Sequence, residues 1–199
     1  MNKILNIAAG NMLPLKPLTQ NDFLVNIDLN YFNASTAGHV ESYHRETANS
    51  VKWCLDKPVI TYVNHDVYAF LEKYTEKFDE VVMYRFLEHV PKVKVLYFLY
   101  ILAGCIRVGG TVDVIVPDYK LLSKRILEEN VFDKNFEAED IITTFELLNE
   151  PYCPHASIWT EDRAKYFFEL EKRFKIKDMQ FNFNFDGRNI YLRFQAERV

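Results

Sequence analysis

The sequence predicts an α/β domain built on a mostly parallel seven-stranded sheet that ends in an antiparallel hairpin. Short runs of almost continuous apolar residues recur through the first two thirds of the chain, and segments of helical periodicity lie between them. Such runs are typical of parallel strands that helices cover on both faces. The C-terminal third instead carries two runs of alternating apolar and polar residues around Asp186-Gly187, which is typical of a hairpin.

Five apolar runs give the predicted parallel strands. They are Lys3–Ala8, Phe23–Ile27, Pro58–Val63, Glu80–Tyr84 and Thr111–Val116, the last introduced by a turn at Gly109-Gly110. Pro14 and Pro17 exclude a long helix between the first two strands, so a short loop must join them.

Periodicity places helices between and after these strands. The predicted helices are Tyr68–Lys77, Lys92–Ile106, Tyr119–Glu129 and Glu161–Phe174, with Glu41–Leu55 as the best candidate in the weakly periodic stretch Leu29–Lys57. Thr160 followed by two acidic residues has the pattern of a helix N-cap. Lys175–Phe185 and Asn189–Glu197 are the two strands of the hairpin.

Length and composition fit one globular domain spanning residues 1–199. The chain is 49% hydrophobic and 26% charged, and its net charge of −4 lacks the basic excess that nucleic-acid binding requires. No apolar run is long enough to cross a membrane, and the N-terminus does not resemble a secretion signal, so we expect a cytoplasmic protein. Three cysteines about fifty residues apart fit neither a disulfide framework nor a zinc site.

Two residues at strand ends point to a nucleoside ligand. Ligands of open α/β sheets bind outside the carboxyl ends of the strands. Gly10 follows the first strand, and Asp28 ends the second, eighteen positions later, where a carboxylate can accept hydrogen bonds from ribose hydroxyls. Taken alone, Gly10 could simply be a turn glycine, and Asp28 could simply be a helix cap. The stretch has one glycine and no following helix, so it lacks the donors that a dinucleotide pyrophosphate needs.

Four segments together resemble a known family. They are Ile4–Leu15, Leu24–Asp28, Phe78–Pro91 (FDEVVMYRFLEHVP) and Arg107–Asp118 (RVGGTVDVIVPD), which with the terminal hairpin cover most of the chain. The sequence resembles class I S-adenosylmethionine-dependent methyltransferases, most closely small predicted ones with a short loop between the first two strands. The resemblance implies a Rossmann-like three-layer sandwich and S-adenosylmethionine as cofactor.

The resemblance also assigns cofactor-binding residues at the strand ends. It implies that Gly10 and its neighbours Ala8, Ala9 and Asn11 pack against the methionine part of the cofactor and that Asp28 holds the ribose. It also implies that Asp66 or its neighbours meet the adenine edge and that Tyr84 follows the fourth strand into the pocket. The chain departs from the family at Ala8, where glycine is usual, and at Arg85, where a polar residue or histidine is usual.

Two histidines are the candidates for catalysis. Methyl transfer requires alignment, and a base where the acceptor loses a proton. His89 follows the fourth strand, and His155 lies in the loop Glu150–Thr160, a candidate lid before the last helix. The competing interpretations are that His89 belongs to a helix cap and that Trp159 fixes the last helix to the core. His39, His44 and His65 lack the spacing of metal ligands, so no metal site is expected.

Two functions remain open on these observations. The first is an S-adenosylmethionine-dependent methyltransferase acting on a small-molecule or saccharide acceptor. The second is a methyltransferase-like domain that has lost its chemistry and serves as a binding or partner subunit, which Ala8, Ala9 and the small number of glycines, 6, would fit. The oligomeric state and the acceptor are not specified by the sequence.

Overall fold

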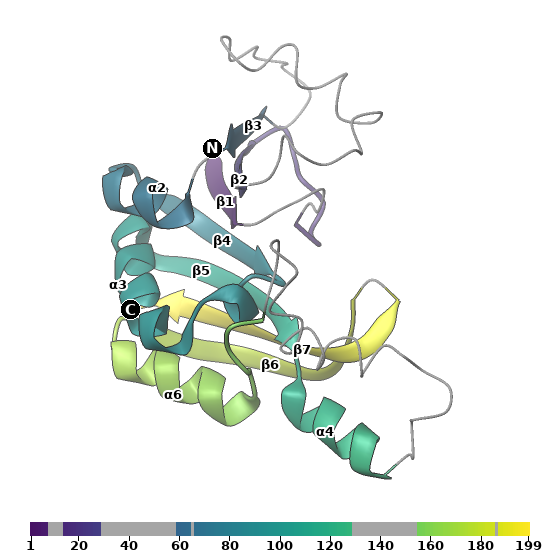
Figure 1. Cartoon of the computed structure of the whole chain (residues 1–199). Helices are drawn as coiled ribbons and strands as arrows, with labels where there is room; N and C mark the ends of the chain where they lie inside the picture. The colour runs from purple at the N-terminus through teal and green to yellow at the C-terminus, as the bar shows by residue number, and fades with distance from the viewer. Residues whose placement is uncertain (8–13, 29–58, 65, 129–154, 186) are drawn as a thin grey trace.

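A computed structural model describes residues 1–7, 14–28, 59–64, 66–128, 155–185 and 187–199 (Figure 1). Three sequence predictions lie outside these residues: the Ala8–Asn11 loop, the helix Glu41–Leu55 and the histidines at positions 39, 44 and 65.

The described residues form a seven-stranded sheet with the order β3-β2-β1-β4-β5-β7-β6. The five parallel strands are β1 (Asn2–Ile7), β2 (Asp22–Asp28), β3 (Val59–Asn64), β4 (Phe78–Tyr84) and β5 (Ile106–Pro117). The hairpin consists of β6 (Phe174–Phe185) and β7 (Arg188–Arg198), and β7 runs antiparallel to both β5 and β6. The predicted fold class, including the single reversed strand inside a parallel sheet, is confirmed.

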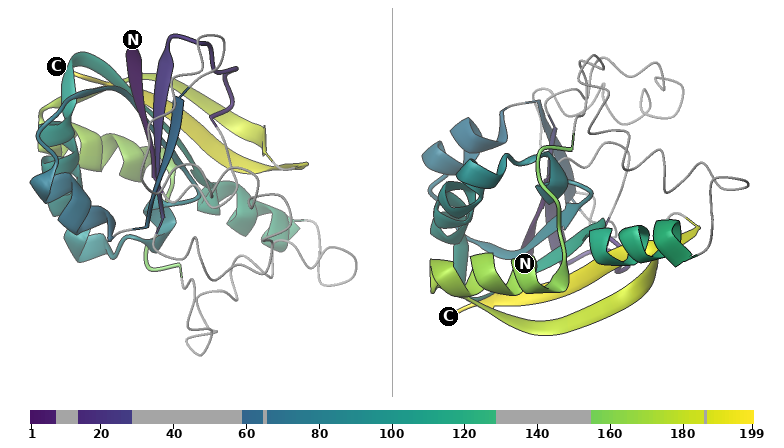
Figure 2. Two further views of the ribbon diagram at one scale, coloured as in Figure 1. Left: turned by 90° about the horizontal axis from the view of Figure 1, so that it is seen from above. Right: turned by 60° about the horizontal axis from the view of Figure 1, so that its bottom comes forward.

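Helices lie on both sides of this sheet (Figure 2). Three of them pack on one face: α2 (Val67–Lys73), α3 (Val95–Cys105) and α6 (Glu161–Glu171). The start of α4 (Tyr119–Glu128) packs on the other face, where Tyr119 and Leu122 join Ile4, Leu24 and Val82 in a separate apolar cluster. The arrangement is the three-layer sandwich that the resemblance implied.

Strand periodicity separates these two cores. Along β1, Leu5 and Ile7 enter the larger core beneath α3, whereas Ile4 faces the smaller one. Asn6 points the same way as Ile4, and its side-chain amide donates to Asn26 Oδ1 of β2 at 2.9 Å. The smaller core therefore contains buried polar groups, and they are hydrogen-bonded to each other.

Three predicted helices are shorter than expected. The first ends at Lys73, because Tyr74 is extended and its ring stacks on Phe70 and Phe78 with centroids 4.8 Å from each, as the chain crosses to β4. The second begins with a 3₁₀ turn at Lys92–Lys94 and is α-helical only from Val95. The third difference is at the end of α6, where Lys172 adopts the left-handed conformation and Phe174 already starts β6.

The prediction of a turn at Gly109-Gly110 is wrong, because both glycines lie within β5. The ladder to β4 is irregular here, pairing Phe78 with Ile106 and then Glu80 with Thr111. Gly109 has a φ of +79°, and a Cβ on Gly110 would stand 2.9 Å from the Arg107 carbonyl oxygen and 3.0 Å from that of Asp79. The two glycines therefore permit a bulge in a strand rather than a reversal of the chain.

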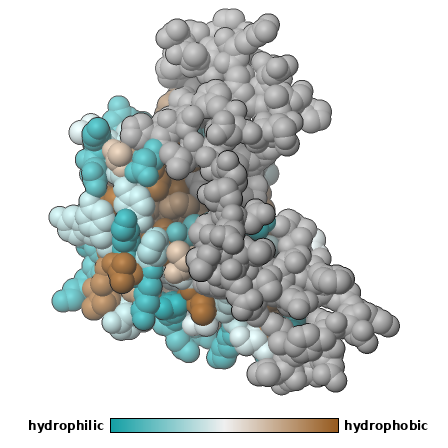
Figure 3. All heavy atoms as spheres, viewed as in Figure 1, coloured by the Kyte–Doolittle hydropathy of each residue, from teal (hydrophilic) through white to brown (hydrophobic). Residues whose placement is uncertain are grey.

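The described surface in Figure 3 is mainly hydrophilic, with apolar side chains in small separate patches. Among the described residues, no helix combines the length and the apolar character that a membrane span needs.

Replacing Gly110 by alanine tests the bulge. We expect Gly110→Ala to destabilise the protein by about 1–3 kcal/mol, because the added methyl group meets backbone oxygens that cannot move without disturbing the sheet. Gly104→Ala in α3 is the matched control, since its Cβ would have no neighbour within 4 Å and alanine favours a helix. Urea unfolding measures both; equal stabilities for the two variants would contradict the assigned bulge.

Candidate functional site

The candidate site lies at the carboxyl edge of the sheet, next to β4. The order of the strands reverses between β1 and β4, and ligands of open α/β sheets bind at such a point. Beyond Tyr84, Arg85 has a φ of 56°, a conformation that costs a residue with a Cβ free energy. It turns the chain into a 3₁₀ turn, Leu87–His89, which carries Glu88 and His89 to this edge.

A set of hydrogen bonds joins this turn to the segment 155–159 from the C-terminal third. The amides of Ala156 and Ser157 both donate to the Glu88 carbonyl oxygen, at 2.7 and 2.9 Å. The Ser157 hydroxyl donates to the Leu87 carbonyl oxygen at 3.0 Å and accepts from the indole nitrogen of Trp159 at 2.9 Å. We call this set of bonds the clasp. It fixes two segments that are far apart in the chain against each other.

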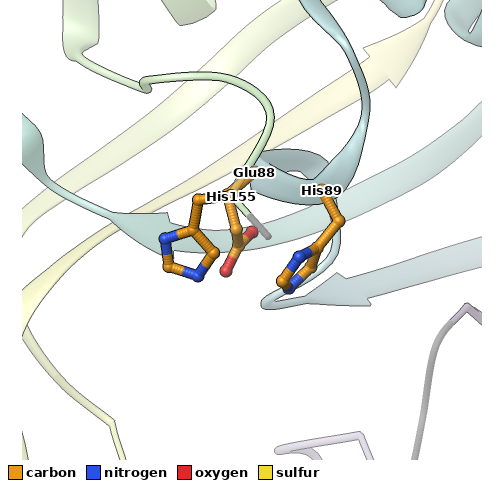
Figure 4. A group of neighbouring side chains, drawn as sticks. All are labelled: Glu88, His89 and His155. Atoms are coloured by element: carbon orange, nitrogen blue, oxygen red, sulfur yellow. The ribbon is translucent and has the colours of Figure 1, made fainter. Parts of the chain in front are cut away.

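The clasp brings together the two histidines that the sequence proposed as catalytic. The ring centroids of His89 and His155 are 5.0 Å apart and the planes are inclined by 68°. Figure 4 shows the Glu88 carboxylate between the two rings. One ligand-type atom from each of Glu88, His89 and His155 lies within 4.8 Å of the others, so this trio has the composition of a metal site. We call it the Glu88 cluster.

Glu88 is fully buried, and neither of its carboxylate oxygens has a hydrogen-bond partner among the described residues. Burial raises the pKa of this carboxyl to about 8, because the charged form loses its hydration. Without a bound ion, Glu88 therefore keeps its proton at neutral pH.

His155 is also buried, and its Nδ1 lies 2.7 Å from the hydroxyl oxygen of Tyr119, the first residue of α4. The pKa of His155 is lowered to about 4, mainly by burial and additionally by the neighbouring His89 and Arg85. The ring is therefore neutral at pH 7. A protonated acid and a neutral imidazole lie side by side, an arrangement that recurs at functional sites.

On the cofactor side, the structure places the strand ends but not every side chain. Ala8–Asn11 lies outside the described residues. Ile27 is paired with Ile7, so Asp28 is one position beyond the end of β1, where it is paired with Asn64 of β3. Asp66 caps α2 by accepting a hydrogen bond from the Ala69 amide at 2.9 Å. The cofactor roles of these residues remain predictions.

Tyr84 ends β4 as expected, and its side chain enters the smaller core. Its hydroxyl donates to Asp113 Oδ2 at 2.8 Å and accepts from the Leu15 amide at 3.4 Å. Arg193 holds the same carboxylate with two hydrogen bonds, at 3.0 and 2.8 Å. A buried carboxylate thus links β4, β5 and β7, and the Tyr84 hydroxyl is part of that link.

Alternate residues of the segment before α6, His155, Ser157 and Trp159, are buried in the protein. Trp159 is fully buried in the larger core, next to Phe167 of α6, which favours the packing explanation over the lid for this residue. Sequence reasoning missed Tyr119 and Ser157. No local pattern marks either one, because each acts on a residue more than 30 positions away in the chain.

A hollow of about 460 Å³ opens beside Asp118, the residue that precedes Tyr119. Residues of α4, the start of α6 and β6 line it: Asp118, Lys120, Leu121, Lys124, Glu161, Phe181 and Asn182. It lies at the same edge of the sheet as the ends of β5 and β6.

Replacing Ser157 tests the clasp. We expect Ser157→Ala to cost about 1–3 kcal/mol, because it removes one buried hydrogen bond and leaves the buried Trp159 indole nitrogen without its acceptor. Ser123→Ala, at an exposed position of α4, is the control and should change stability by less than about 0.5 kcal/mol. Unfolding in urea measures both, and a Ser157→Ala protein as stable as the control would refute the role given to the hydroxyl.

The pKa of Glu88 predicts how stability depends on pH. The unfolded carboxyl titrates near 4.5 and the folded one near 8, so the folded protein binds an extra proton between these values and loses stability as pH rises. His155 acts oppositely, but only below about pH 6.5, where the unfolded ring takes up a proton that the buried ring refuses. Between pH 6.5 and 8 we expect Glu88 to contribute a loss of stability of up to about 2 kcal/mol.

Denaturation in a chelating buffer across this range is the measurement, with Glu88→Gln as the comparison. The glutamine variant has no proton to lose and should show a flat profile. A wild-type profile that is equally flat would show that Glu88 titrates normally.

Comparison with solved structures identifies the fold. A SAM-dependent methyltransferase from Methanosarcina mazei matches with a TM-score of 0.54 at 16% identity, over 100% of this chain and 92% of that one. The N-methyltransferase NodS from Bradyrhizobium japonicum matches with a TM-score of 0.53 at 10% identity, over 99% and 85% of the two chains. A Burkholderia thailandensis 1,6-didemethyltoxoflavin-N1-methyltransferase, solved with its substrate and S-adenosylhomocysteine, matches with a TM-score of 0.56 at 12% identity, over 99% and 71%.

No family model matches the sequence, and no curated protein matches it. The likeness therefore lies in the arrangement of the sheet and its helices. It extends over the whole chain and recurs across several methyltransferases. The chain has the fold of the class I S-adenosylmethionine-dependent methyltransferases.

Proposed function

We propose that the protein transfers a methyl group from S-adenosylmethionine to a hydroxyl or amine of a small-molecule or saccharide acceptor. The observation that carries the proposal is the meeting of β1, β2 and β4 at the reversal of strand order, with Asp28 at the end of β2 and the two histidines beyond β4. Structures of similar fold were solved with S-adenosylhomocysteine, among them NodS and the magnesium protoporphyrin IX methyltransferase of Synechocystis.

The strand ends fit the parts of this cofactor. Asp28 is the last residue of β2 and lies one position beyond the end of β1, so its backbone is at the carboxyl edge of the sheet, where we place the ribose if the methionine part occupies the Ala8–Asn11 loop. The cofactor supplies an activated methyl group, so the protein has mainly to align the acceptor and accept its proton.

On the acceptor side, His89 is half-buried, and His155 is buried with its ring centroid 5.0 Å from that of His89. His155 is neutral at pH 7, but its low pKa makes it a weak base. We therefore assign contact with the acceptor to His89 and a positioning role to His155. The hollow beside Asp118 offers room for an acceptor of the size of a monosaccharide or a small ring compound.

Calorimetric titration with S-adenosylhomocysteine tests the cofactor assignment. We expect binding, and we expect Asp28→Ala to weaken it by about 1–3 kcal/mol, or roughly 10- to 150-fold, because ribose hydroxyls lose a charged acceptor. Asp162→Ala, an exposed carboxylate on α6, is the control and should bind as the wild type does. Absence of binding to the wild type, or equal affinity of the Asp28→Ala variant, would contradict the assignment.

The alternative is a partner subunit without chemistry, which Ala8 and Ala9 in the first loop favour, because their methyl groups crowd a close ligand. A screen of hydroxyl- and amine-bearing acceptors, with S-adenosylhomocysteine formation as the readout, separates the two functions. Cofactor binding without turnover of any acceptor would support the partner subunit.

A further inference from the structure

We propose that Glu88, His89 and His155 form a binding site for a divalent first-row transition-metal ion, for which Zn²⁺ is the probe. Two imidazoles and one carboxylate are a donor set that such ions accept, with open positions left for further ligands. The inference concerns this chain's own side chains and does not depend on methyl transfer.

The spacing of the donor atoms is close to that of a bound set. They lie within 4.8 Å of one another. Donor atoms about 2.0–2.2 Å from a tetrahedral ion stand roughly 3.3–3.6 Å apart, so side-chain rotation must bring the most distant donors together by about 1.3 Å to close the set. His89 is half-buried, so its ring is the least enclosed of the three donors.

The surroundings of Glu88 suit a bound cation. A carboxylate buried away from solvent normally has hydrogen-bond partners or a counter-charge. Both oxygens of Glu88 are fully buried and have no hydrogen-bond partner among the described residues, although the clasp holds the same residue's carbonyl oxygen with two amides. The nearby charge of Arg85 favours the ionised carboxylate but supplies no hydrogen bond to its oxygens. The backbone is therefore fixed while the side-chain oxygens, which lie between the two rings, are left without a partner (Figure 4).

Tyr119 supplies the outer contact that metal-binding histidines usually have. Its hydroxyl is bonded to Nδ1 of His155, which fixes the ring, so we assign Nε2 as the nitrogen that would bind the ion. In that arrangement Nδ1–H donates to the Tyr119 oxygen. Tyr119 is thus a positioning residue for the metal, and it is not a ligand.

If the proposed function holds as well, the ion would also help to deprotonate the acceptor. An acceptor hydroxyl bound at an open position of the ion would lose its proton more readily, as metal-bound water does. This consequence rests on the proposed function, whereas binding of the ion does not.

Titration of the tag-free full chain with Zn²⁺, in the absence of any cofactor, tests the proposal. We expect one ion per chain. His89→Ala should weaken binding by more than the roughly 10- to 100-fold that loss of an outer contact costs, and Tyr119→Phe should weaken it within that range. Glu88→Gln should weaken it as His89→Ala does. Co²⁺ bound to the wild type should give a visible absorption spectrum that these variants lose or weaken.

Two control variants distinguish Zn²⁺ binding at the Glu88 cluster from binding by other histidines and cysteines. His39→Ala/His44→Ala and Cys54→Ser/Cys153→Ser leave all three donors in place and should bind Zn²⁺ as the wild type does. Thermal melting without metal shows which variants fold; His89→Ala should, because that side chain is only half-buried.

Three results would overturn the proposal. They are no Zn²⁺ binding at micromolar concentration, binding that His89→Ala leaves unchanged, and binding that is lost in either control. Titration of the same proteins with S-adenosylhomocysteine reports separately on the proposed function, so the two can fail independently.

Discussion

The candidate site depends on one carbonyl oxygen. The backbone of Glu88 accepts hydrogen bonds from two successive amides, those of Ala156 and Ser157, and Ser157 adds a third bond to the neighbouring carbonyl. Each bond contributes only about 1 kcal/mol to stability. Their combined effect is positional, because they join the turn after β4 to a segment about 70 residues later in the chain, which the burial of Trp159 also holds in place.

This arrangement lowers the stability of the fold in two ways. Burying the Glu88 carboxyl without partners, and placing Arg85 in a left-handed conformation just before it, both oppose folding. The rest of the fold can support these costs, since a large apolar core lies under the turn and includes Leu87, Val90 and Trp159. By contrast, the buried Asp113 on the opposite face has Arg193 and Tyr84 as partners. The buried carboxylate of Asp113 is thus hydrogen-bonded between strands of the sheet, whereas the buried carboxyl of Glu88 has no hydrogen-bond partner among the described residues and lies where ligands of this fold bind.

The sequence predicted the order and direction of the strands well, because strands buried on both faces leave continuous apolar runs and the hairpin leaves alternating ones. It failed at Gly109-Gly110, where glycines that permit a bulge are indistinguishable by residue type from glycines that make a turn. The sequence placed the ends of α2 and α6 too late. The first end depends on the stacking of Tyr74 on Phe78, and the second on the left-handed conformation of Lys172, and neither is visible in the helical periodicity.

The site was predicted only in part. His89 and His155 were identified separately, each from its position after a strand or before a helix. Their contact with each other, the burial of Glu88 and the part played by Tyr119 all follow from the clasp. A hydrogen bond between backbone groups cannot be recognised from residue identity. The spacing of metal ligands along the sequence therefore gave no sign of this cluster, whose members come from distant segments of the chain.

Amide hydrogen exchange of Ala156 and Ser157 is the most direct test of the clasp. The side chain of Ala156 is exposed, so a residue in an ordinary loop would exchange its amide quickly there. If both amides are bonded to the Glu88 carbonyl oxygen as the structure has it, they exchange as slowly as the amides of β4 and β5, with opening free energies close to that of global unfolding. Exchange at the rate of an exposed loop would contradict the clasp, and with it the assembly of the two histidines into one site.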